Sequence, residues 1–239
     1  MIKKEMVMSK KYVLFDLDGT LTDSCEGITK SVQYGLEAVG IHEENMDVLR
    51  RYIGPPLDFS FQQFHGLTGD DNAKAVSKYR QRYADKGLYE NRVYDGIIDV
   101  LEALKKRGYV LALATCKPEK FAVPIMEHFQ LAQYFTVMVG SDLEGGARRH
   151  KSDVIEEVFV RLNKAFNGEA ELTEDILTEM KADAVMVGDR NNDILGAKAC
   201  QMESLGVRYG FAEPDELEDA GADYIIDSVV EIVAAIEQM

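Results

Sequence analysis

The sequence predicts an α/β protein in which a parallel β-sheet is covered by helices. Six short apolar runs have the length of buried strands, at residues 12–15, 110–114, 135–139, 184–187, 204–207 and 224–226. Amphipathic stretches lie between them, such as the one that carries Ile97, Ile98, Leu101 and Leu104 at helical spacing. Strands that alternate with helices are typical of a parallel sheet with helices packed against its faces.

A long helical stretch interrupts this alternation after the first strand. Residues 24–92 show helical patterns but no convincing strand, and such a stretch is too long to be a simple loop. We therefore predict a catalytic core of residues 1–23 and 93–239 with an all-helical cap inserted at residues 24–92. We expect the cap to lie over the C-terminal edge of the sheet, where it can exclude water and select substrates.

A smaller irregularity lies at residues 163–182, a polar and acidic segment that separates a helix from the next strand. Residues 174–180 have the pattern of a short helix. Because charge runs usually face solvent, we interpret the segment as a solvated excursion rather than a partner site.

The composition excludes nucleic acid as the main partner and a disulfide-based fold. The chain has 239 residues, of which 46% are hydrophobic, and this is ample for a core. Its net charge of −15 comes from 27 basic and 42 acidic residues, whereas proteins that bind nucleic acid neutralise phosphates with Lys and Arg. The three cysteines are too few and too widely spaced for a disulfide framework: Cys25, Cys116 and Cys200.

The N-terminal residues lack the apolar segment of a signal peptide, and no run approaches the ~18 apolar residues of a membrane span. The cysteine usage fits a reducing compartment. We therefore expect a soluble cytoplasmic protein without a membrane partner, either a monomer or a homodimer.

The most informative segment is Asp16-Leu17-Asp18-Gly19-Thr20, which follows the first predicted strand. Its two carboxylates emerge at the C-terminal edge of that strand, where open α/β sheets place their ligands. Gly19 permits a tight turn close to a ligand, and Thr20 can cap the turn or helix that follows. The segment can hold a cation and a phosphate, although a buried strand that ends in an acidic turn would carry the same residues.

Two further segments can bind an anion. Thr115 ends the second core strand just before a helix, and a hydroxyl beside exposed backbone N–H groups makes an anion site, although a lone Thr there is more often a plain cap. Lys151 precedes another helix and by itself could be a surface charge. Three neighbouring cations nevertheless create a local positive field in this acidic chain: Arg148, Arg149 and His150.

The fourth segment runs from Val185 through Gly188 and Asp189 to Asp193, again a strand that leads into a turn and a helix. Asp189 ends its strand as Asp16 does, and Asp193 lies one helical turn further on. Hard oxygen ligands at adjacent strand ends suit Mg²⁺. Neither His nor Cys is arranged to bind zinc.

With these four segments in this order, the chain resembles the haloacid dehalogenase superfamily of phosphotransferases. The resemblance extends from residue 12 to about residue 200 and implies a Rossmann-like, doubly wound parallel sheet with the strand before Asp16 at its centre and an inserted helical cap. Dehalogenating members lack an acid at the position of Asp18, so a halide substrate is disfavoured.

The resemblance implies a role for each carboxylate. Asp16 would attack phosphorus and form an aspartyl-phosphate, and Asp18 would protonate the leaving oxygen and later activate water. Mg²⁺ would be held by Asp16, the main-chain carbonyl of Asp18 and Asp189, with Asp193 supporting the metal site. Phosphoryl transfer needs an in-line nucleophile and groups that compensate the charge on the phosphoryl oxygens, so these roles agree with the chemistry.

The phosphoryl oxygens would be bound by Thr115 and Lys151. Cys116 follows Thr115, and we interpret it as a small neighbour of this phosphate site rather than as a nucleophile, because no His is placed to activate it.

Within the superfamily, the segments 18–24, 52–57 and 87–91 are similar to bacterial phosphoglycolate phosphatases and 5′-nucleotidase-like phosphatases. This similarity implies a small phosphorylated metabolite as substrate, such as phosphoglycolate or a nucleoside monophosphate. Gly54-Pro55-Pro56 could be either a substrate loop or a rigid turn. Five residues are candidates for substrate contact: Arg50, Gly54, Pro55, Lys117 and Arg148.

The first interpretation is therefore a Mg²⁺-dependent phosphomonoester hydrolase. A phosphosugar mutase of the β-phosphoglucomutase type would use the same core but return the phosphoryl group to its substrate. A receiver-like phospho-switch also combines an acidic cluster with Thr and Lys, but it would be about half this size and would lack the acid/base Asp18.

Overall fold

The computed structural model describes residues 10–143 and 146–239, and its centre is a six-stranded parallel sheet. The strand order is β5-β4-β1-β6-β7-β8. The strands are β1 (Tyr12–Phe15), β4 (Val110–Pro118), β5 (Val137–Ser141), β6 (Ala184–Gly188), β7 (Glu203–Val207) and β8 (Tyr224–Ile226). This confirms the predicted α/β fold with a parallel sheet.

The central strand β1 pairs in parallel with β4 on one side and with β6 on the other. Phe15 lies opposite Leu113 of β4 and Val187 of β6, so the three strands end at the same edge. Every residue of β1 and β6 is buried, because helices cover both faces of a parallel sheet.

Two apolar layers pack against the two faces of the sheet. One face, with Val13 and Phe15, packs on α5 (Ile97–Lys106), α6 (Glu119–His128) and α11 (Ile232–Ile236). The other, with Tyr12 and Leu14, packs on α7 (Lys151–Asn167) and α9 (Asn191–Ala199). Because successive side chains of a strand point to opposite faces, the apolar run of β1 contributes to both layers.

Short helices complete the core. They are the 3₁₀ turns η2 (Ala132–Tyr134) and η3 (Val229–Glu231), α8 (Glu174–Ala182) and α10 (Glu216–Ala220). The predicted strand at 135–139 begins later because η2 occupies the preceding residues, and the predicted last helix divides into η3 and α11. Helix α8 confirms the short helix predicted in the acidic excursion, and most of its residues are exposed.

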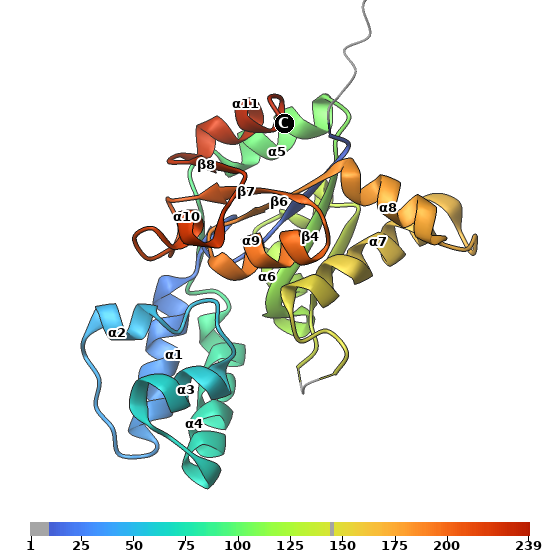
Figure 1. Ribbon diagram of the computed structural model, residues 1–239. Coiled ribbons are helices and arrows are strands. Elements are labelled where there is room, and N and C mark those ends of the chain that lie inside the picture. Colours follow the sequence, from blue (N-terminus) through green and yellow to red (C-terminus); the bar gives the residue numbers. More distant parts are fainter. Residues whose placement is uncertain (1–9, 144–145) are drawn as a thin grey trace, which may run out of the picture.

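A group of helices follows β2 (Thr22–Asp23) and ends before β3 (Arg92–Val93), and these two short strands pair antiparallel. We call this group, residues 25–87, the helical insertion. It contains α1 (Cys25–Glu37), α2 (Met46–Arg50), α3 (Leu57–His65), α4 (Gly69–Arg82) and the π-helix η1 (Tyr83–Gly87). Figure 1 shows the insertion, in blue to blue-green, as a cluster beside one end of the sheet.

Close backbone contact joins the first and last helices of the insertion. A Cβ added to Gly27 of α1 would lie 2.1 Å from the carbonyl oxygen of Gly87, so this contact requires glycine. Gly35 makes a similar approach to Ala75 of α4. The insertion is therefore internally packed, with its apolar side chains continuous with one layer of the core.

Cys25, Cys116 and Cys200 are all free thiols, which agrees with the prediction that no disulfide framework is present. In the part of the chain that the structure describes, no helix has both the length and the apolar character needed to cross a membrane.

Candidate active site

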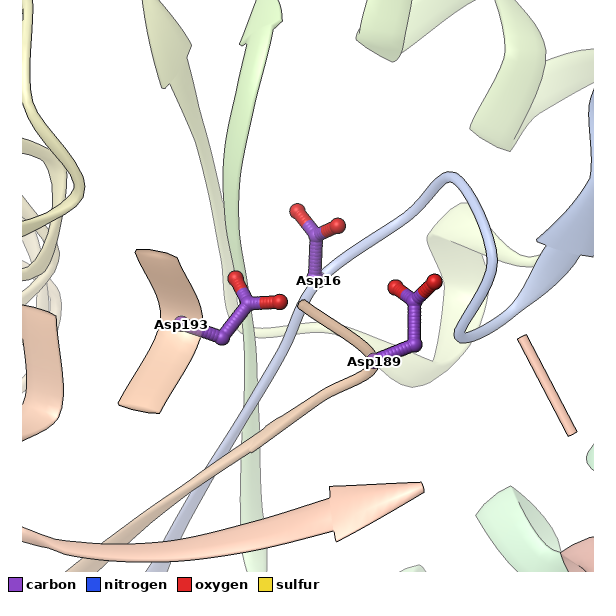
Figure 2. Close-up of side chains that lie close together, drawn as sticks. All are labelled: Asp16, Asp189 and Asp193. Carbon is purple, nitrogen blue, oxygen red and sulfur yellow. The ribbon is translucent and has the colours of Figure 1, made fainter. Parts of the chain in front are cut away.

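Three carboxylates converge at the C-terminal edge of the sheet (Figure 2). Asp16 follows β1, Asp189 follows the neighbouring strand β6, and Asp193 lies in the first turn of α9. One oxygen from each carboxylate lies within 4.8 Å of the others. The pairing of β1 with β6 brings the first two together, and the N–H of Asp16 donates to the carbonyl of Val187 at 2.9 Å.

Lys151 bridges two of these carboxylates. Its ammonium donates to Asp16 Oδ1 and to the carbonyl of Ala114, both at 2.8 Å, and lies 2.6 Å from Asp193 Oδ1. Burial lowers the pKa of Lys151, but the Asp16 and Asp193 carboxylates raise it, and the net shift is upward. Lys151 therefore carries a positive charge at any physiological pH.

Asp189 is completely buried in a cradle of backbone and hydroxyl groups. Thr20 Oγ1 donates to it at 3.1 Å, and the N–H of Phe211 donates to it at 2.7 Å. Gly19 has φ +86°, and a Cβ added there would lie 2.0 Å from Asp189 Oδ2. Gly19 thus provides the tight turn that the sequence predicted, and its close approach is to the Asp189 carboxylate.

The electrostatics of this cluster favour a bound cation. Burial raises the pKa of Asp189 well above its usual range, and the charges of Asp193 and Asp16 raise it further. Burial also raises the pKa of Asp193 to about 6, although Lys151 lowers it. Three buried carboxylates lie together, and the Lys151 ammonium contacts two of them, Asp16 and Asp193. Carboxylate oxygens are ligands that Mg²⁺ prefers, so the donor set fits a divalent metal.

Asp18 points to a different partner. Its Oδ2 accepts from the ammonium of Lys117 at 2.6 Å, while its buried Oδ1 has no hydrogen-bond partner among the described residues. Lys117 lies two residues after Thr115, whose hydroxyl accepts from the Lys117 N–H at 3.2 Å. The same ammonium lies 4.7 Å from the ring centroid of Tyr83 in the insertion. Lys117 therefore contacts the candidate acid/base and the insertion together.

Cys116 lies beside this cluster as a protonated thiol. Burial raises its pKa to about 11, against a smaller lowering by Lys151. Its sulfur accepts from Asn192 Nδ2 at 3.4 Å. A thiol of this kind is a weak nucleophile at neutral pH, which favours the interpretation of Cys116 as a small neighbour of the site.

A cavity of about 730 Å³ opens above the carboxylates, between the sheet edge and the insertion. Most predicted site residues line it: Asp16, Asp18, Gly54, Pro55, Thr115, Cys116, Lys117, Arg148 and Lys151. Asp189 and Asp193 lie beneath them and are fully buried. The insertion adds aromatic walls that the sequence analysis did not include: Tyr52, Phe59, Tyr79 and Tyr83.

Two candidates for substrate contact, Arg50 and Arg148, are held by acidic side chains. Arg50 does not line the cavity: it ends α2 on an exposed face, with its guanidinium 3.8 Å from Asp47. Arg148 does line the cavity, but its guanidinium is held by acids of the core, at 2.7 Å from Asp142 and 3.7 Å from Glu119. Arg148 therefore lines the cavity with its guanidinium already paired, and its contact with substrate stays a prediction.

The sequence analysis also missed Arg190, which lies between Asp189 and α9. Its side chain donates to the carbonyl of Ile53 in the insertion and to Glu216 of α10. Its position next to Asp189 was the one available signal, because nothing in the local sequence indicates that residues 53 and 216 lie nearby.

Comparison with known proteins agrees with this geometry. The family model described as haloacid dehalogenase-like hydrolase matches residues 13–207. A 5′-nucleotidase from Pseudomonas aeruginosa is 43% identical over 205 residues, which is 86% of each chain. The tyrosine-protein kinase PtkA of Mycobacterium tuberculosis is 34% identical over 210 residues, 88% of this chain and 66% of that protein. A crystal structure of a predicted phosphatase from Clostridium acetobutylicum superposes with a TM-score of 0.84, at 43% identity over 96% of this chain and 99% of that one.

The chain belongs to the haloacid dehalogenase-like hydrolases. It is an enzyme of the phosphatase class within that family, and the resemblance found in its sequence is confirmed.

Proposed function

We propose that this enzyme is a Mg²⁺-dependent phosphomonoesterase that acts on a small phosphorylated metabolite through an aspartyl-phosphate on Asp16. The observation that carries the proposal is the cluster of Asp16, Asp189 and Asp193 within 4.8 Å, bridged by Lys151 at the floor of a cavity. A nucleophile, a metal site and a cation beside one another are what phosphoryl transfer needs.

The metal would be held by Asp16, Asp189 and the main-chain carbonyl of Asp18. Asp193 would support this metal site. When bound, Mg²⁺ would neutralise charge on the phosphoryl oxygens. Lys151 and Thr115 would bind the same oxygens from the other side, because both lie at this edge of the sheet and line the cavity.

The reaction would proceed in two displacements. A carboxylate oxygen of Asp16 attacks phosphorus, the bond to the leaving oxygen breaks, and Asp18 donates a proton to that oxygen. Asp18 then takes a proton from a water molecule that attacks the same phosphorus, which releases inorganic phosphate and restores the Asp16 carboxylate. Lys117 Nζ lies 2.6 Å from Asp18 Oδ2, and this contact supports a place for the Asp18 carboxylate at the cavity wall, while only the main-chain carbonyl of Asp18 would serve as a metal ligand.

The helical insertion would serve as the cap that the sequence analysis predicts at residues 24–92, and the cavity lies between it and the core. A cavity of about 730 Å³ fits a metabolite and excludes a folded phosphoprotein. Among its aromatic lining residues Phe59 is exposed, whereas Tyr52, Tyr79 and Tyr83 are almost fully buried. An exposed aromatic ring favours a leaving group with a flat or apolar part. A nucleoside monophosphate has such a part and phosphoglycolate does not, and the relative from Pseudomonas aeruginosa is named a 5′-nucleotidase.

We expect the enzyme to act as a monomer or a homodimer. The free thiols support a reducing cytoplasm as its compartment.

The test is a panel of phosphorylated metabolites that contains nucleoside monophosphates, phosphoglycolate and sugar phosphates. Inorganic phosphate is measured with Mg²⁺ and with EDTA, and no nucleoside triphosphate is added. We expect Mg²⁺-dependent release from at least one compound, with nucleoside monophosphates preferred. Phosphate that moves within a sugar only after a bisphosphate is added would instead indicate a mutase, and release that is insensitive to EDTA would contradict the metal site.

A further inference from the structure

Arg190 connects the carboxylate cluster to the helical insertion. Its main-chain N–H donates to Asp193 Oδ2 at 3.0 Å, so its backbone belongs to the floor of the site. Its side chain reaches the other way, where Nη1 donates to the carbonyl of Ile53 at 2.6 Å. The side chain is only 15% exposed, which shields this link from water.

The core holds the guanidinium in position for this contact. Arg190 Nε donates to Glu216 Oε1 at 2.8 Å. Glu216 is itself fixed, since its carboxylate accepts from the N–H of Asn191 at 2.8 Å and from the N–H of Glu213 at 2.9 Å. A planar guanidinium that is held on one edge presents its other N–H groups in a fixed direction. The direction here is toward the insertion.

The segment that receives the hydrogen bond forms part of the cavity wall. Gly54 and Pro55, which follow Ile53, both line the cavity. Gly54 has φ +107°, and a Cβ added there would lie 3.5 Å from both Cγ and Nη1 of Arg190. The loop 53–56 therefore rests on the Arg190 side chain, and its glycine provides the backbone conformation for this.

Other direct links between core and insertion differ in kind, such as the ring contact of Tyr83 with Phe121 of α6. Arg80 of α4 donates to the carbonyl of Leu143 at 3.2 Å, and Lys117 lies over the ring of Tyr83. Neither of these reaches the loop 53–56. Arg190 is thus the described side chain that joins this loop to the residues next to Asp189.

We propose that Arg190 is a positioning residue that holds the loop 53–56 of the insertion closed over the phosphate site. Its effect on turnover rests on the proposed function, whereas its effect on the loop does not. Because the closed loop completes the cavity wall, loss of this hydrogen bond lowers the population of the arrangement that binds substrate, and apparent affinity falls by the same factor. The core carboxylates keep their own contacts, so metal binding changes less.

The first experiment measures hydrogen exchange by mass spectrometry in the full-length protein, without substrate. Arg190→Met removes the N–H donors and keeps much of the side-chain length. Arg190→Lys keeps a positive charge, but its single ammonium can reach only one of the two acceptors, the Ile53 carbonyl or the Glu216 carboxylate. Arg107→Met is the control, since Arg107 makes an exposed ion pair with Glu237 at 2.6 Å, at the end of α5. We expect roughly tenfold faster exchange in peptides of residues 50–58 for Arg190→Met, a smaller increase for Arg190→Lys and none for Arg107→Met.

The second experiment separates closure from damage to the metal site. Steady-state kinetics with p-nitrophenyl phosphate should show a KM raised roughly tenfold in Arg190→Met with a smaller change in kcat, and the affinity for Mg²⁺ alone should change less than threefold. Unchanged exchange in residues 50–58 would overturn the proposal, whether or not the protein is a phosphatase. Weaker Mg²⁺ binding with unchanged exchange would show instead that Arg190 supports only Asp193.

Discussion

The ammonium of Lys117 lies 2.6 Å from a carboxylate oxygen of Asp18, and the same ammonium lies over the ring of Tyr83 in the helical insertion. Both charged side chains are nearly buried, so the pair is weakly screened by solvent. Lys117 comes from the end of β4 and Asp18 from the loop after β1. The candidate acid/base Asp18 is therefore held by Lys117, which also contacts the insertion.

We predict that Asp18→Asn damages turnover in a way that depends on the leaving group. The amide keeps the main-chain carbonyl for the metal but can neither donate the proton to a leaving oxygen nor activate water, and loss of such catalysis costs about 10²–10⁴-fold. Aryl phosphates need less protonation than alkyl phosphates do. Single-turnover phosphorylation of the enzyme should therefore fall less for p-nitrophenyl phosphate than for an alkyl phosphate, and equal losses would count against Asp18 as the acid.

Asp16→Asn should abolish turnover and leave the fold intact, because it removes the nucleophile without a change in volume. Loss of a nucleophile usually costs many powers of ten in rate. The measurement is phosphate release at saturating Mg²⁺, with circular dichroism and thermal unfolding as controls for the fold. A variant that keeps more than about a tenth of the wild-type rate would exclude covalent catalysis through Asp16.

Lys151→Met should destabilise the protein, because it leaves Asp16 and Asp193 buried without their shared ammonium. Removal of one partner from a buried ion pair costs about 3–5 kcal/mol in the free energy of unfolding. The matched control is Lys164→Met, whose ion pair with Glu169 is mostly exposed and should cost less than about 1 kcal/mol. Urea unfolding at pH 8 measures both, and similar values for the two variants would contradict a central role for Lys151.

The sequence predicted most of the site because its residues lie where strands end. Asp16 and Asp189 follow β1 and β6, and Thr115 lies in the second half of β4. Parallel strands bring their C-terminal ends to one edge. Lys151 and Asp193 could be predicted from their places in the first turns of two helices, α7 and α9. The order of motifs along the chain was enough to place these groups together.

What the sequence did not predict depends on how the insertion packs against the core. The hydrogen bond from Arg190 to Ile53 joins residues 137 positions apart, and no local pattern encodes it. The place of Arg50 outside the cavity lining could not be predicted for the same reason, since a basic residue near the Gly54 loop can face the cavity or solvent according to the direction of α2. The division into core and cap domains, and the role of each site residue, stay predictions.

Cys116 should react slowly with iodoacetamide in the native protein. Burial raises its pKa to about 11 from the ordinary value of 9.0, which lowers the thiolate fraction at pH 8 roughly a hundredfold. The more basic thiolate is roughly tenfold more nucleophilic, so the net rate should be at least about tenfold lower than in the urea-unfolded chain. Peptide mass spectrometry measures the rate at Cys116 itself. Equal rates in the native and unfolded protein would show that the thiol is neither buried nor perturbed.

Mg²⁺ should stabilise the protein more at pH 8 than at pH 5. Burial raises the pKa of Asp193 from 3.8 to about 6, and Asp189 is shifted in the same direction. Between pH 3.8 and about pH 6 the Asp193 carboxyl binds its proton more tightly in the native state than in the unfolded chain. The metal-free protein therefore loses stability as the pH rises through this range. Each unit by which the pKa of Asp193 is raised corresponds to about 1.4 kcal/mol of this loss.

A divalent cation offsets this loss by neutralising the carboxylates, and protons compete with it at low pH. Thermal unfolding with Mg²⁺ or with EDTA should therefore give a larger difference in Tm at pH 8 than at pH 5. Asp193→Asn removes one of the repelling charges, so in the metal-free protein it should flatten the decline in stability between pH 4 and pH 7. An equal or larger effect of Mg²⁺ at pH 5 would mean that the carboxylate cluster is not the site where the metal binds.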